Sequence, residues 1–207
     1  ALSFPMLGFS YLVNTEIAFS IWFFSLLMRV QEGLFGMVGL SSPEKLWYAP
    51  PEPIIAHQGM GAFIIMVLFG LWTARDHLRD VARKAFRGDD TIDDSDELLS
   101  YRVAVFGFLG CNMLMSVWLW MAGLVFWAVP VYLGAMYLMF LGVTRIVAEG
   151  GIAAARAPLI PSDFLHSAFG NTALGPSSLT ALGFTFVWAA DVRTFVMASV
   201  ANGLKLA

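Results

Sequence analysis

The sequence predicts an all-α, polytopic integral membrane protein with about five membrane segments, some of them broken or re-entrant. The chain has 207 residues, of which 58% are hydrophobic and only 13% are charged, about half the charged share of a soluble domain. Residues 103–144 contain no charged side chain, and one helix of that length would be about twice as long as the bilayer core is thick. Gly, Pro and charged residues interrupt the shorter apolar stretches, which favours broken helices.

Composition also excludes several classes of protein. The net charge of −3 and the lack of a basic patch argue against binding to nucleic acid. The single Cys111 lies in apolar sequence, so neither a disulfide framework nor a zinc motif is expected. Motifs for a nucleophile, a phosphate loop or a metalloprotease do not occur, and we predict no enzyme activity, no cofactor and no metal. Because the chain starts and stops next to apolar sequence, we expect a piece of a longer membrane protein.

The first predicted span covers residues 15–32. Asn14 suits the N-cap of this helix, Glu16 suits the positive end of its dipole, and Gly33 suits the position after its last turn. Residues 1–13 are apolar but too short to cross a bilayer, so we expect a half-helix or a re-entrant segment there. In a second interpretation the two pieces form one broken span, and Asn14 and Glu16 then lie near its middle.

The second predicted span covers residues 55–75. The prolines of residues 33–54 cannot continue a helix, so this stretch is predicted to be a loop. After the span, a charged amphipathic pattern predicts that the helix extends into water. The basic residues are concentrated in the charged loop 76–100, and the positive-inside rule places that loop in the cytoplasm. His57 and Gln58, at the entrance of the span, are expected to face a solvated interface.

The third and fourth predicted spans cover residues 102–121 and 124–147 and form an antiparallel hairpin. The break between them is predicted at Met121-Ala122-Gly123. Pro130 lies near the start of the second helix of the pair, where a missing N–H costs least. The turn is then outside, and Arg145 returns the chain to the cytoplasmic side.

The chain becomes irregular after residue 151. A short helix is predicted to end at Gly170, and another is predicted to begin at Gly175. A fifth membrane segment is predicted over residues 178–200. Asp191 and Arg193 interrupt it, so it is either a half-helix or one span with a buried ion pair.

Polar residues within this apolar chain are the candidates for a substrate or ion pathway. A carboxylate at the centre of a bilayer costs about 2.5–3.5 kcal/mol, so it is usually paired or functional. Glu16 is the leading candidate for a proton carrier, although Asn14 and Glu16 can equally well cap a helix at the interface. The predicted set is Asn14, Glu16, Arg145, Glu149, Arg156, Asp163, His166, Asp191 and Arg193.

Two pairs in this set have helical spacing. Arg145 and Glu149 lie four residues apart and can pair on one face of a helix, just before the chain becomes irregular. The pair can hold a substrate or ion at a broken helix end, or it can simply mark a capped helix end. Asp163 and His166 lie three residues apart, which suits a proton relay or a solvated helix surface.

Two stretches of the sequence carry a resemblance to a known family. Residues 3–24, which include Asn14-Thr15-Glu16, form the first, and Arg145-Ile146-Val147-Ala148-Glu149-Gly150-Gly151 followed by Pro161-Ser162-Asp163-Phe164 forms the second. They resemble a group of large uncharacterised bacterial membrane proteins that is similar to the oligopeptide transporter superfamily. The resemblance covers most of the chain and implies proton-coupled transport by a longer protein in the bacterial inner membrane.

The sequence therefore predicts a secondary transporter of an organic solute such as an oligopeptide or a metal chelate, with Glu16 as the protonatable site. The expected partners are the lipid bilayer, the small organic solute, protons, and the remaining segments of a longer parent chain or other membrane subunits. The alternative prediction is a structural or accessory subunit of a larger membrane complex, in which the polar residues hold helices together.

Overall fold

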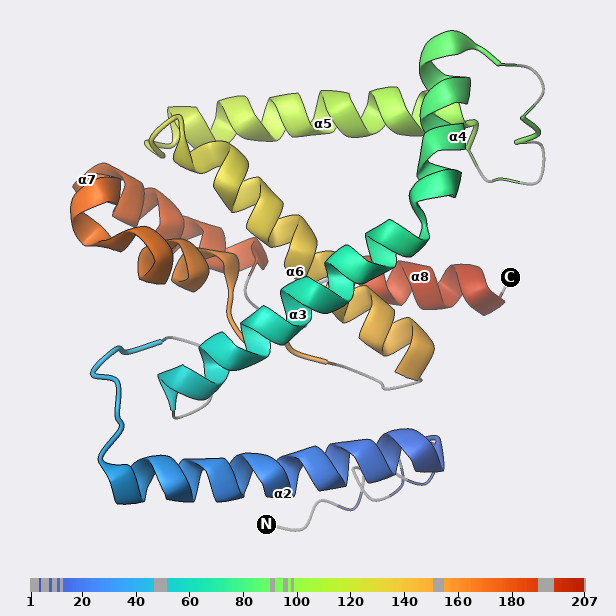
Figure 1. The fold of residues 1–207 in the computed structure, drawn as a ribbon. Coiled ribbons are helices and arrows are strands. Elements are labelled where there is room, and N and C mark those ends of the chain that lie inside the picture. Colours follow the sequence, from blue (N-terminus) through green and yellow to red (C-terminus); the bar gives the residue numbers. More distant parts are fainter. Residues whose placement is uncertain are drawn as a thin grey trace.

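The computed structural model describes residues 4, 8, 11, 13–46, 52–89, 92–94, 97, 99–150, 155–189 and 196–206 (Figure 1). Within these ranges the regular structure is entirely helical. The main helices are α2 (Thr15–Val38), α3 (Pro53–Thr73), α4 (Arg75–Arg87), α5 (Tyr101–Met121), α6 (Ala128–Gly150), α7 (Pro161–Ala189) and α8 (Val196–Leu206). Among them, α2, α3, α5 and α6 are long and apolar enough to cross a membrane. The predicted all-α integral membrane class is confirmed.

Helix α6 lies at the centre of the described fold and packs against α3, α5, α7 and α8 (Figure 1). In the most apolar stretch of α6, 44% of the residues are buried, whereas no residue is buried in the corresponding stretch of α2. Small residues such as Ala128, Ala135 and Gly142 on the buried face of α6 let the neighbouring helices approach closely, which is how helices associate in lipid. Helix α6 is therefore the scaffold on which the other elements are placed.

The turn between α5 and α6 forms where the sequence predicts it and is held by α7. Gly123 has a φ of 105°, a backbone conformation that favours glycine. Its carbonyl accepts a hydrogen bond from Ser177 at 3.1 Å, and the buried Ser178 Oγ accepts one from the Val125 N–H at 3.1 Å. Helix α6 begins at Ala128 rather than at residue 124, because the intervening residues belong to this turn.

The charged stretch after α3 forms a separate helix instead of extending the span. Helices α3 and α4 meet at Ala74, where the Arg75 guanidinium donates to the Trp72 carbonyl at 3.3 Å. Helix α4 then packs against α5. Asp94 connects the following loop to both helices, since it pairs with Lys84 at 3.5 Å and accepts from the Tyr101 N–H at 3.1 Å.

The predicted end of the first span at Gly33 is wrong. Helix α2 continues to Val38, and Gly39 takes the left-handed capping conformation with a φ of 73°. Residues 34–38 are mostly apolar and continue the helix, and a glycine within a helix costs only about 1 kcal/mol. The half-helix predicted over residues 1–13 lies almost entirely outside the described residues.

Helix α7 is broken at the two glycines that the sequence singles out. Gly170 and Gly175 have positive φ values of 72° and 73° with ψ values of 168° and 165°, so neither is helical. Figure 1 shows α7 doubling back on itself between them. We call residues 161–169 the first arm and residues 176–189 the second arm. The predicted interruption at Asp191 and Arg193 lies outside the described residues.

Candidate functional site

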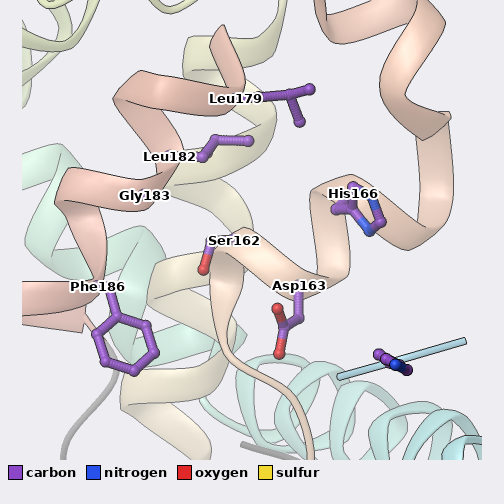
Figure 2. Close-up of a pocket in the computed structure, with 8 residues that line it drawn as sticks. Ser162, Asp163, His166, Leu179, Leu182, Gly183 and Phe186 are labelled. Atoms are coloured by element: carbon purple, nitrogen blue, oxygen red, sulfur yellow. The ribbon is translucent and has the colours of Figure 1, made fainter. Parts of the chain in front are cut away.

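A pocket of about 380 Å³ lies between the two arms of α7 (Figure 2). The first arm supplies polar side chains and the second arm supplies an apolar wall across from them. A lysine from the loop after α2 also lines the pocket. The lining residues are Lys45, Ser162, Asp163, His166, Leu179, Leu182, Gly183 and Phe186.

Helical periodicity places the polar groups of the first arm on one face. Asp163 and His166 lie three residues apart and both line the pocket, while Leu165 between them is fully buried in the core against α6. Asp163 is only 5% exposed. A carboxylate buried this deeply in an apolar helical protein is the type of residue that usually serves a function.

Glu44 connects three elements beside this pocket. Its Oε2 lies 2.9 Å from the Nε2 of His57 at the start of α3, and its Oε1 accepts a hydrogen bond from Ser167 on the first arm. Its backbone N–H donates to Ser42 Oγ at 3.4 Å. The loop after α2 is thereby attached to α3 and to α7, and the next residue, Lys45, is held in the lining of the pocket.

These contacts keep Glu44 ionised. The hydrogen bond from Ser167 lowers the pKa of Glu44 most, and the hydrogen bond from His57 lowers it further. The charges of His57 and His166 act in the same direction, whereas burial opposes them. The pKa of Glu44 therefore lies below its usual range.

Acid is expected to weaken this attachment. Because the folded pKa of Glu44 is depressed, its contribution to stability is complete above the ordinary glutamate pKa of about 4.3 and is lost as the pH falls through the folded value. We expect the melting temperature of the wild type to fall more steeply between about pH 5 and pH 3 than that of Glu44→Gln. Thermal unfolding in detergent across this range measures the difference. Glu52→Gln is the control. If the melting temperature of Glu44→Gln falls with pH as steeply as that of the wild type, the prediction is contradicted.

Sequence reasoning missed most of the Glu44 cluster. His57 and Gln58 are exposed, as expected, but the sequence did not predict their partners: His57 contacts Glu44, and Gln58 accepts a hydrogen bond from Gln31 of α2 at 2.6 Å. Ser167 lies far from Glu44 along the chain, so no local pattern relates the two. The only signal was that Glu44 and its neighbour Lys45 are isolated charges in an otherwise weakly charged loop.

The remaining predicted site residues that the structure describes lie in different parts of the fold, while Asp191 and Arg193 fall outside the described residues. Asn14 accepts a hydrogen bond from the Glu16 N–H at 3.2 Å, as the capping interpretation expects, and Glu16 is exposed in the first turn of α2. The predicted pairing of Arg145 with Glu149 is confirmed at 2.9 Å. Arg156 is exposed between α6 and α7. Of the predicted set, the structure thus brings Asp163 and His166 into one pocket and Arg145 and Glu149 into another.

Comparison with protein families finds a match. A family model described as "Family of unknown function (DUF6785)" matches residues 1–207. Neither a curated protein nor a solved structure matches the chain.

Proposed function

We propose that this chain, which belongs to the DUF6785 family of unknown function, is the solute-binding part of a proton-coupled secondary transporter. The solute is an organic molecule such as an oligopeptide or a metal chelate, and it binds between the two arms of α7. One observation carries the proposal. A helix that is broken at Gly170 and Gly175 lines a pocket with a buried carboxylate, a histidine and a lysine.

Broken helices have a physical role in transporters. Irregular backbone at membrane depth is tolerated only where protein buries it or where it lines a cavity. Its unpaired N–H and C=O groups can then bind a solute or an ion, and many secondary transporters place their sites at such interruptions. In α7 the side chains of the two arms line the pocket, and the break contributes by turning the arms toward each other.

The lining of the pocket suits a solute that carries both charges and an apolar group. The Lys45 ammonium attracts a carboxylate, and the Asp163 carboxylate attracts an amine or a metal-bound cationic group. Leu182 and Phe186 offer an apolar surface on the opposite arm. His166 adds an imidazole to the lining, whose ring nitrogens can donate a hydrogen bond to the solute or accept one from it.

The resemblance to the oligopeptide transporter superfamily supports proton coupling. In that interpretation Glu16 remains a proton carrier on α2, while solute recognition belongs to α7. The two roles rest on different helices and can therefore be tested separately.

Uptake into proteoliposomes tests the proposal. The full-length protein would be reconstituted and supplied with labelled di- and tripeptides and a labelled iron chelate, with and without an inward proton gradient. We expect gradient-driven uptake of at least one of these solutes, and we expect Asp163→Asn to lose most of it because the solute loses its charged partner. Asp76→Asn is the matched control, since it removes an exposed carboxylate on α4.

The outcomes separate the possible roles. Uptake that Asp163→Asn retains but Glu16→Gln abolishes would contradict solute binding by α7 and would place the pathway at α2. If the folded wild type takes up none of these solutes under a gradient, transport of this solute class is excluded.

One observation favours the alternative role of a structural or accessory subunit. Helix α2 exposes aromatic side chains along its length, among them Phe19, Trp22 and Phe24, and the stretch that makes it a candidate span has no buried residue. Such a surface is suited to contact another membrane subunit as well as lipid. In that case, replacing the pocket residues would change thermal stability or assembly but not uptake.

A further inference from the structure

A second pocket, of about 480 Å³, lies between the C-terminal halves of α3 and α6. Aliphatic side chains form most of its lining, and the polar groups come chiefly from α6. The residues are Val67, Gly70, Leu71, Thr73, Ala74, Leu141, Thr144, Arg145, Ala148 and Glu149. Arg145 is the one basic group and Glu149 the one acidic group of this lining. An apolar pocket of this kind suits a ligand that has an apolar tail and an anionic head, provided that the head faces the guanidinium and not the carboxylate.

Arg145 is held in place but keeps donors to offer. Its Nε donates to Glu149 Oε1 at 2.9 Å, and within the described ranges its two terminal nitrogens make no hydrogen bond. The guanidinium lies against the backbone of α3, because a Cβ on Gly70 would come within 2.5 Å of Nη1. The absence of a side chain at Gly70 thus provides the space that the guanidinium occupies.

The terminal nitrogens of Arg145 are the donors that this pocket offers. The Oγ1 of Thr144 has no hydrogen-bond partner among the described residues, but it is fully buried and does not reach the pocket surface. Guanidinium donors require a partner with acceptor oxygens, such as a phosphate.

The surroundings place this pocket at a membrane–water interface. Trp72, next to the lining residues, is exposed, and the Arg75 guanidinium lies 4.9 Å from the centre of its ring. Exposed tryptophan beside arginine is typical of the headgroup level of a bilayer. The basic helix α4 follows directly, and the positive-inside rule assigns this end of α3 and α6 to the cytoplasmic leaflet, which carries anionic lipids.

We propose that this pocket binds an anionic glycerophospholipid. The phosphate accepts hydrogen bonds from the terminal nitrogens of Arg145, and an acyl chain lies along Val67, Leu71 and Leu141. Glu149 positions the guanidinium through Nε and leaves the other donors for the lipid. The site does not depend on solute transport, since none of its residues lines the pocket between the arms of α7.

Native mass spectrometry of the full-length protein with equimolar phosphatidylglycerol and phosphatidylcholine tests this site. We expect the wild type to retain phosphatidylglycerol preferentially, and Arg145→Gln to reduce that preference about fivefold, the effect of one basic side chain at the membrane surface. Gly70→Ala keeps every charge but displaces the guanidinium, so it is expected to reduce the preference as well. Arg79→Gln on the exposed face of α4 is the control, and it is expected to reduce the preference clearly less than Arg145→Gln, because Arg79 does not line the pocket.

Three results would overturn the assignment. Equal losses for Arg145→Gln and Arg79→Gln would show diffuse attraction between the lipid and the basic helix. Competition by millimolar inorganic phosphate that removes the lipid preference would show a site for free anions. The third is a wild type that retains both lipids equally.

Discussion

Replacing both Gly170 and Gly175 with alanine is expected to destabilise the protein by about 2–6 kcal/mol. Both glycines combine a positive φ with a ψ near 165°, a region of backbone conformation that is essentially restricted to glycine. Each alanine therefore costs about 1–3 kcal/mol. The turn between the arms of α7 depends on these two positions, so we also expect the double variant to lose solute binding in the pocket.

Chemical unfolding in mixed micelles, followed by tryptophan fluorescence, measures the stability change. Gly107→Ala is the matched control, because Gly107 lies in the exposed part of α5 and no atom lies within 4 Å of a Cβ added there. Alanine is a better helix former than glycine, so this control is expected to leave stability unchanged or to raise it by up to about 1 kcal/mol. Equal stability of the double variant and the wild type would contradict the requirement for glycine at this turn.

Replacing Gly142 with alanine is expected to cost about 1–3 kcal/mol at the contact between α3 and α6. A Cβ on Gly142 would overlap the Phe63 ring, which is buried between the two helices. The ring cannot move freely, since Val143 and Val147 pack around it in the same cluster. Thermal unfolding of the variant in detergent gives the size of the loss.

A second substitution separates this overlap from other effects of alanine. Phe63→Leu removes the ring atoms that the new methyl group would meet, so the double variant should lose less stability than the two single variants together. Gly134→Ala on the exposed face of the same helix is the control, because a Cβ there meets nothing within 4 Å. Additive losses in the double variant would show that Gly142 and Phe63 are not coupled.

Most of the elements follow from local chemistry and could be predicted from the sequence. An uncharged stretch too long for one span requires a hairpin, and the turn at Gly123 forms at the predicted break, Met121-Ala122-Gly123. The breaks at Gly170 and Gly175 were also predictable, because a backbone of positive φ favours glycine. The pairing of Arg145 with Glu149 follows from the spacing of a helix.

Element ends were less predictable, since a helix signal does not distinguish between several capping residues. Gly33 and Gly39 are both suitable ends for α2, and the apolar residues between them decide in favour of the second. In the same way, the charged sequence after α3 is helical whether it extends α3 or forms a helix of its own. Only the structure places a change of element at Ala74.

The sequence by itself thus determined the membrane class, the hairpin and the two breaks in α7, because hydrophobic length, turn chemistry and helical spacing act over neighbouring residues. Only the tertiary structure decided which polar groups meet. Glu44 meets Ser167 and His57, and Lys45 joins Asp163, because the loop after α2 lies against α3 and the first arm of α7. Such contacts arise from the packing of helices that are distant in the sequence, and no local pattern of residues encodes them.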